Sequence, residues 1–114
     1  MKPRKFSVRL LRVAEDDLSE IISYIAAENV AAADDITAKI EKNLSLLSTH
    51  PRIGRIPREE ELAKLGYRYL IVADYLIFYT IETRTVLVHR ILHGAFCNLV
   101  PSLQYRLPSR LRPV

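Results

Sequence analysis

The sequence predicts an α+β domain: an N-terminal strand, then an antiparallel helical hairpin packed on one face of a small antiparallel sheet. Three observations support this fold class. Apolar residues recur at helical spacing between residues 13 and 47, and strand-forming residues dominate three runs between residues 67 and 92. The connections between those runs are so short that they join only antiparallel neighbours.

The chain opens with a strand and then changes period. Residues 6–11 are rich in strand formers and loosely alternate. From Val13 onward an apolar stripe follows the spacing of an amphipathic helix, formed by Leu18, Ile21, Ile22 and Ile25. We expect Glu15, Asp16 and Asp17 in its first turn, where carboxylates suit the positive end of the helix dipole.

A second helical stripe follows a break at Glu28-Asn29 and ends before His50-Pro51. Its members are Ala33, Ile36, Ile40, Leu44 and Leu47. Two helices joined by so short a connection form an antiparallel hairpin. We therefore expect eight side chains to line the interface between hairpin and sheet: Leu18, Ile21, Ile22, Ile25, Ile36, Ile40, Leu44 and Leu47.

Residues 49–66 are predicted to form a loop, because prolines and glycines punctuate them, with a helical turn around residues 59–64. Three strands are then expected at residues 67–72, 75–81 and 86–92. The middle strand is apolar on both faces, with Tyr75, Ile77, Tyr79 and Ile81 on one face and Leu76 and Phe78 on the other. Helices on one side would leave the second face as a candidate partner-binding groove.

We expect one domain over residues 1–97 and an irregular, basic, proline-containing tail over residues 98–114. No apolar run reaches the length of a membrane span, and no signal-peptide core follows the basic N-terminus, so we expect a cytoplasmic protein. Cys97 is the only cysteine, which excludes an intrachain disulfide. The three scattered histidines do not form a metal-binding pattern, and no cofactor is expected.

The charges are unevenly distributed along the chain. Residues 13–49 carry eight acidic side chains and two lysines, whereas residues 50–114 carry ten basic and five acidic side chains. This asymmetry has two interpretations, namely an anionic partner for the basic part or a pair of solvated faces.

Five short phrases resemble the RelE/ParE superfamily of toxins, and the ParE-type members most closely. In order they are DLSEIISYI at 17–25, HPRIGR at 50–55, YRYLIV at 67–72, YLIFY at 75–79 and RILHGA at 90–95. The resemblance implies the toxin of a type II toxin–antitoxin (plasmid stabilisation) system, neutralised by a cognate antitoxin encoded beside it. Toxin and antitoxin of this kind can form higher-order assemblies.

The resemblance also implies a target. ParE-type members poison DNA gyrase, whereas RelE-type members cleave mRNA on the ribosome. We expect gyrase inhibition. The alternatives are a ribosome-dependent mRNA endonuclease and a degenerate, non-toxic module that only binds antitoxin.

The two toxin types differ in chemistry. Metal-free RNA cleavage needs an acid, a base and cations around the phosphorane. RelE-type toxins supply an arginine in the strand motif where this chain has Leu76. We therefore expect no catalytic residues; a nuclease would have to use Arg68, Arg90 and His93. Strand alternation allows Arg68 to lie on the same sheet face as Leu76. It also allows Arg68 and Arg90 to lie on one face.

Six residues are expected to contact the antitoxin or the target: Arg52, Arg55, Arg68, Tyr75, Arg90 and His93. For His93 a structural role in the turn with Gly94 is favoured over acid–base chemistry. His89 is expected on the same strand face as Leu87 and Ile91, as a packed residue. ParE-type members often continue the HGA phrase with a basic–acidic pair, and this chain has Phe96-Cys97-Asn98 instead. If the C-terminal end of the chain contributes to gyrase binding, the absence of the basic–acidic pair implies a weak or inactive toxin.

Overall fold

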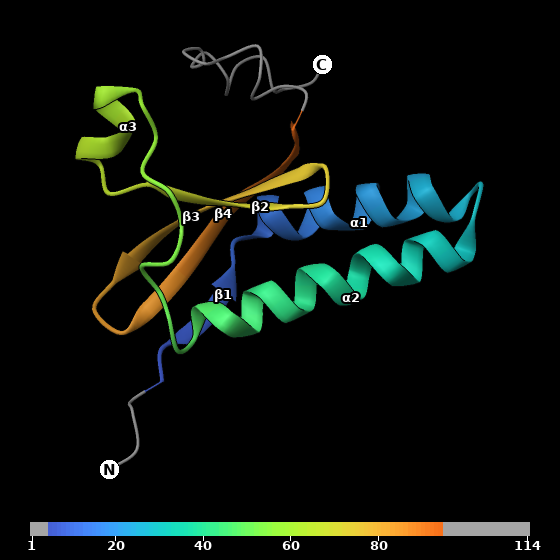
Figure 1. Cartoon of the computed structure of the whole chain (residues 1–114), viewed down its shortest axis with the longest axis horizontal. Coiled ribbons are helices and arrows are strands. Elements are labelled where there is room, and N and C mark those ends of the chain that lie inside the picture. Colours follow the sequence, from blue (N-terminus) through green and yellow to red (C-terminus); the bar gives the residue numbers. More distant parts are fainter. Residues whose placement is uncertain (1–4, 95–114) are drawn as a thin grey trace.

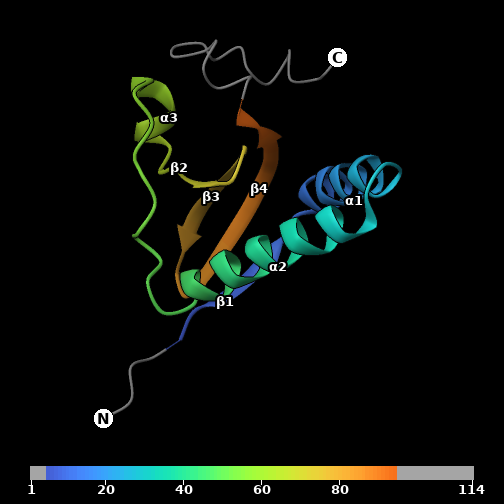
Figure 2. The ribbon, with the colours of Figure 1, turned by 45° about the vertical axis from the view of Figure 1, so that its right-hand side comes forward.

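A computed structural model describes residues 5–94 of the chain. Within that range two long helices lie side by side against one face of a four-stranded sheet, and a short third helix stands at the far edge (Figures 1 and 2). This is the α+β class that the sequence predicts. In chain order the elements are β1 (Ser7–Leu10), α1 (Arg12–Ala26), α2 (Val30–Leu47), α3 (Glu60–Lys64), β2 (Arg68–Val72), β3 (Tyr75–Glu82) and β4 (Thr85–His93).

The sheet has the strand order β1-β4-β3-β2 and is mixed rather than wholly antiparallel. The pairs β2–β3 and β3–β4 are antiparallel, as their short connections predict. β1 instead runs parallel to β4, with Ser7 opposite Thr85 and Leu10 opposite Val88. Short connections determine the direction only of strands adjacent in sequence. The direction of β1 depends on where the hairpin packs, which the sequence pattern does not reveal.

The helical hairpin is confirmed, and its turn has a clear local cause. The side chain of Asn29 accepts a hydrogen bond from the backbone N–H of Ala32 at 2.9 Å and caps the start of α2. The predicted break at Glu28-Asn29 is therefore a capped helix start. α1 begins at Arg12, one residue before Val13, so its first turn contains Glu15 but not Asp16 or Asp17.

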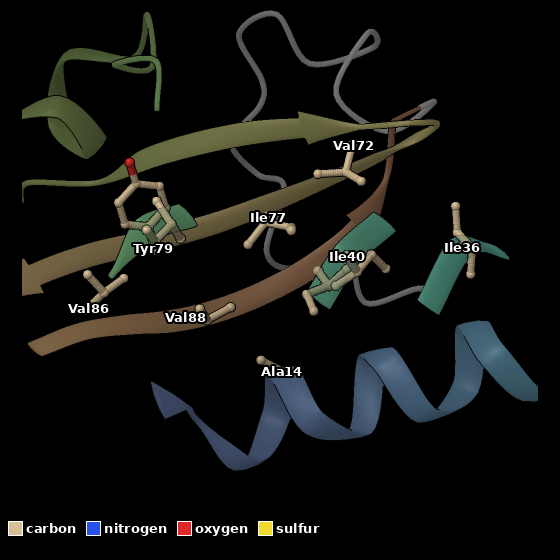
Figure 3. Packing of buried hydrophobic residues seen from close by; sticks show 10 residues of the cluster. Ala14, Ile36, Ile40, Val72, Ile77, Tyr79, Val86 and Val88 are labelled. Carbon is tan, nitrogen blue, oxygen red and sulfur yellow. The ribbon is translucent and has the colours of Figure 1, made fainter. Parts of the chain in front are cut away.

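The core lies between the hairpin and the sheet (Figure 3), and three of the eight predicted interface residues are buried in it: Ile36, Ile40 and Leu47. Four more of the eight predicted interface residues pack partly against this cluster: Leu18, Ile21, Ile25 and Leu44. The eighth, Ile22, is only half-buried and lies outside the cluster, so its predicted place is wrong. Ile22 stands next to the stripe that faces the sheet, and the hairpin shields only part of it.

β3 is apolar on both faces, as predicted. Ile77 and Tyr79 belong to the core cluster on the helix side. Leu76 lies on the other face and is also buried, at 4% exposed; the polar Thr80 shares that face and is 7% exposed. The register between β3 and β4 shifts beside Phe78, which faces Arg90, whereas Tyr79 faces Val88. His89 is therefore the extra residue of a β-bulge.

In the described part of the chain, none of the helices has the length and hydropathy of a membrane span. The expectations for Phe96, Cys97 and Asn98 and for the tail over residues 98–114 fall outside the described residues.

Candidate functional site

The structure separates the six predicted contact residues into three groups. Arg52, Arg55 and Arg68 meet at the loop that follows α2. Tyr75 and His93 lie opposite each other at one end of the β3–β4 pair. Arg90 contacts α1. Arg68 faces Tyr79, four residues along β3 from Tyr75, or roughly 13 Å at the usual rise of a strand.

The buried hydroxyl of Tyr79 anchors the loop after α2. This oxygen donates to the carbonyl of Pro51 at 2.7 Å and accepts from the backbone N–H of Gly54 at 2.8 Å. In Figure 3 the hydroxyl points away from α1. Burial is the main cause that raises the pKa of Tyr79, while its hydrogen bond to Gly54 and the charge of Arg68 lower it. A Cβ at position 54 would lie 2.5 Å from the hydroxyl oxygen, so this site requires glycine.

Arg68 supports the same loop from β2. One guanidinium nitrogen donates to the carbonyls of Arg52 at 3.2 Å and Gly54 at 3.0 Å. Arg55 forms an antiparallel bridge with Tyr69, using both backbone groups of each residue. The loop is therefore tied to the sheet by side-chain and backbone bonds. Arg68 uses its charge to hold the loop.

Arg68 and Leu76 lie on opposite faces of the sheet, so the shared face that strand alternation allowed does not occur. Directly paired residues share a face, and Arg68 pairs with Tyr79 on the helix side. Leu76 alternates with Ile77 and occupies the other face. Arg90 pairs with Phe78, which is on the face of Leu76. Arg68 and Arg90 therefore do not share a face either, because even residue numbers on two strands indicate a common face only when the register between the strands is known.

Arg90 is held by Asp17 of α1 in a two-pronged ion pair. Its Nε donates to one carboxylate oxygen of Asp17 at 2.7 Å, and Nη2 donates to the other at 2.9 Å. The first oxygen also accepts the backbone N–H of Ile91 at 3.0 Å. The hydrogen bonds to Asp17 are the largest cause that raises the pKa of Arg90, and burial opposes them. The charge of the Arg90 guanidinium is therefore neutralised by Asp17.

The Asp17 contact exists because β1 is shorter than β4. Backbone pairing by β1 ends at Val88, whose carbonyl accepts the N–H of Leu11. Beyond that point the chain turns into α1, and the Asp17 carboxylate takes the place of the missing strand beside Ile91. The sequence contains a signal for this contact. Asp17 lies three residues after the buried Ala14 and one before Leu18, within the apolar stripe, where a carboxylate needs a partner.

Tyr75 and His93 form an edge-to-face ring pair, with centroids 5.3 Å apart and planes at 80°. Burial is the main cause that raises the pKa of Tyr75, and the charges of Asp74 and Tyr24 add to it. The next residue, Gly94, donates its N–H to the carbonyl of Asp74. A Cβ at Gly94 would lie 2.9 Å from that carbonyl oxygen. The end of the β3–β4 pair that holds Tyr75 and His93 is thus tightly packed.

His89 belongs to a polar cluster on the sheet face opposite the helices. Its Nε2 lies 2.9 Å from the hydroxyl of Thr80, and its Nδ1 lies 3.4 Å from the hydroxyl of Tyr67. The expectation of a packed histidine agrees with this half-buried position, but its predicted neighbour Ile91 is on the core face. The β-bulge at His89 breaks the alternation that placed them together.

Burial of His89 lowers the pKa of its imidazole from the ordinary 6.5, and Glu82 opposes this effect. The folded state then binds fewer protons than the unfolded state, so acidification below about pH 6.5 removes stability. We expect the stability difference between the parent and His89→Gln to narrow as pH falls from neutral to 5 in chemical denaturation. His50→Gln is the control for losing an exposed histidine. A difference that widens on acidification would contradict a lowered pKa.

Within residues 5–94 no group of three or more histidine, cysteine, aspartate or glutamate side chains is placed to hold a metal ion. Histidines and arginines also do not converge on one point, since Arg68, Arg90 and His89 occupy different surroundings.

Comparisons with known proteins agree with this fold. A family model described as "ParE toxin of type II toxin-antitoxin system, parDE" matches residues 8–96, well over half of the chain. The structure resembles a chain of the chromosomal ParDE TA system of P. aeruginosa, with a TM-score of 0.63 and 18% identity over 77% of this chain and 95% of that one. It also resembles a chain of the toxin–antitoxin complex RelBE2 from Mycobacterium tuberculosis, with a TM-score of 0.56 and 27% identity over 81% and 94%.

A search of curated proteins gives no match. The family match covers both helices of the hairpin and, apart from Ser7, every strand of the sheet. It therefore includes the loop held by Tyr79 and the pair formed by Asp17 and Arg90. The chain belongs to the ParE toxin family of type II toxin–antitoxin systems.

Proposed function

We propose that this ParE-type toxin inhibits DNA gyrase when free and is neutralised by a cognate antitoxin. The observation that carries the choice of target is the state of the arginines near Leu76. A nuclease of the RelE type needs a free cation at the scissile phosphate, and a leucine can neither bind a phosphate nor offset charge in the transition state.

Neither candidate arginine is suited to replace that cation. Arg68 lies on the opposite sheet face from Leu76 and donates to the loop carbonyls of Arg52 and Gly54. Arg90 is on the face of Leu76, but both prongs of its guanidinium are bound by Asp17. Freeing Arg90 for a phosphate would leave the partly buried carboxylate of Asp17 without its partner, which opposes such a rearrangement.

The test is to run two assays on one preparation of the free toxin. We expect it to inhibit DNA supercoiling by gyrase and to leave mRNA intact on translating ribosomes. Loss of one electrostatic contact to a reacting phosphate costs about 10²–10³ in rate, so any residual cleavage should be slow. His93→Ala is the variant that distinguishes real cleavage from contamination.

Cuts in mRNA that disappear in His93→Ala would replace gyrase inhibition by the endonuclease alternative. A toxin that neither inhibits gyrase nor cleaves mRNA, but still binds antitoxin tightly, would favour the degenerate module. Tyr75 and His93 are two further proposed contacts. Their side chains pack together, so a change in one affects the other, and each variant should be tested for antitoxin binding and for gyrase binding in separate assays.

A further inference from the structure

The loop after α2 has a three-residue repeat that is visible in both its sequence and its burial. Every third residue is buried, namely Pro51, Gly54 and Pro57. The residues that follow each buried position are the exposed Arg52, Arg55 and Arg58. The next residue in the first two repeats is an exposed isoleucine: Ile53 is 47% and Ile56 is 58% exposed. We call the exposed residues from Arg52 to Ile56 the Arg–Ile strip.

The strip is rigidly supported although its side chains face solvent. Tyr79, Arg68 and Tyr69 hold the backbone from Pro51 to Arg55 through hydrogen bonds. Figures 1 and 2 show this segment (green) along the β2 edge of the sheet, away from the turn that joins α1 to α2. A surface that is ordered before binding loses less conformational entropy when a partner docks.

The positive charges of the strip are not used within the described protein. Among residues 5–94 the ion pairs are Lys39–Asp35 and Arg90–Asp17, and neither involves the strip. Beyond the strip, burial raises the pKa of Glu59, and the charge of the neighbouring Arg58 opposes this effect. The side chains of Arg52 and Arg55 are therefore available to a partner.

We propose that the Arg–Ile strip is a docking surface for an acidic, amphipathic segment of the antitoxin; this inference rests on the proposed function. Aspartate or glutamate side chains of that segment pair with Arg52 and Arg55, and adjacent apolar side chains cover Ile53 and Ile56. Arginine is suited to this role because its planar guanidinium pairs with a carboxylate through two hydrogen bonds.

A nucleic acid is the other anionic partner to consider. Phosphate backbones would suit the arginines alone, but they offer nothing to the two isoleucines beside those arginines, which are about half exposed. An amphipathic peptide uses both kinds of side chain, since covering apolar area adds a contribution that charge does not supply. The alternation of arginine and isoleucine thus favours the peptide.

The experiment measures binding of the full-length toxin to the purified product of the adjacent antitoxin gene. The charge variant is Arg52→Glu with Arg55→Glu, and its control is Arg9→Glu with Arg12→Glu, an equal change of net charge at exposed positions on β1 and α1. We expect the charge variant to weaken binding by about a hundredfold, mostly through a slower on-rate, and to flatten the dependence on salt. The control pair should change affinity by less than about threefold.

The apolar half of the strip needs its own variant, Ile53→Ser with Ile56→Ser. We expect this variant to weaken binding by about tenfold while leaving the salt dependence unchanged, because it removes covered area and no charge. Val13→Ser with Val30→Ser is the control, since these valines are similarly exposed on the helices. Circular dichroism and thermal melting confirm that each variant is folded.

Three results would overturn the inference: antitoxin affinity unchanged in both strip variants, gyrase inhibition lost in the charge variant while antitoxin affinity is kept, or binding of a fluorescent single-stranded oligonucleotide that only the strip supports. The same panel separates the two proposals. A parent chain that does not inhibit gyrase but binds antitoxin through the strip would refute the proposed target and leave the docking surface intact.

Discussion

Ile40→Ala is expected to lower the free energy of unfolding by about 2–5 kcal/mol, a large part of the stability of a domain this size. Ile40 is fully buried between the helical hairpin and the sheet. Its replacement removes apolar area from the core and leaves a cavity that the sheet and both helices can fill only in part. Urea denaturation followed by circular dichroism measures the change directly.

Ile22→Ala is the matched control on the other helix. The same atoms are removed, but Ile22 is half-buried and outside the core cluster. A loss of roughly 1 kcal/mol or less is expected there, because alanine also favours the helix more than isoleucine does. Equal losses at both positions would show that the hairpin packs on the sheet through a different face.

The regular part of the fold follows from sequence patterns. The two helical stripes, the break at Asn29 and the three consecutive strands depend on local spacing, and local spacing is visible in the sequence. The parallel pairing of β1 with β4 depends on a contact between residues almost eighty positions apart. No local pattern specifies it, so the sheet could be recognised as small and layered but not as mixed.

The candidate site was harder to predict because single residues take more than one role. Arg68 and Arg90 have the charge of binding residues, yet a loop carbonyl and a carboxylate occupy them. The bulge at His89 shifts the alternation of β4 and moves Arg90 to the face of Leu76. One inserted residue of this kind reverses every assignment of faces beyond it.

In the loop after α2 the candidate binding residues could be recognised from the sequence, but the packing that supports them could not. Its arginines, Arg52 and Arg55, were recognisable as exposed charges from the sequence, and the structure leaves them exposed. The sequence alone could not reveal that Tyr79, 25 residues away in the chain, makes Gly54 indispensable because its hydroxyl occupies the space that a Cβ would need. The motif around Gly54 is therefore explained by packing, and the arginines beside it remain available for binding.

Removal of the Asp17 carboxylate is the second substitution with a large expected effect. Asp17→Ala leaves the guanidinium of Arg90 and the backbone N–H of Ile91 without their acceptor. The Asp17 side chain is only 13% exposed and that of Arg90 is 32% exposed, so water replaces the lost contacts incompletely. We expect a loss of about 2–4 kcal/mol in the free energy of unfolding.

The matched control is Asp35→Ala, which breaks the ion pair of Asp35 with Lys39 on the surface of α2. Those side chains are 66% and 55% exposed, and the expected loss is below about 0.5 kcal/mol. A double-mutant cycle of Asp17→Ala with Arg90→Ala should give a coupling energy of roughly 1–3 kcal/mol that changes little with added salt, since the pair is partly buried. Part of the loss in Asp17→Ala should persist when Arg90 is already alanine, because the N–H of Ile91 still lacks its acceptor. A coupling energy near zero would mean that Arg90 does not pair with Asp17 in solution, and its guanidinium would then be available to a phosphate.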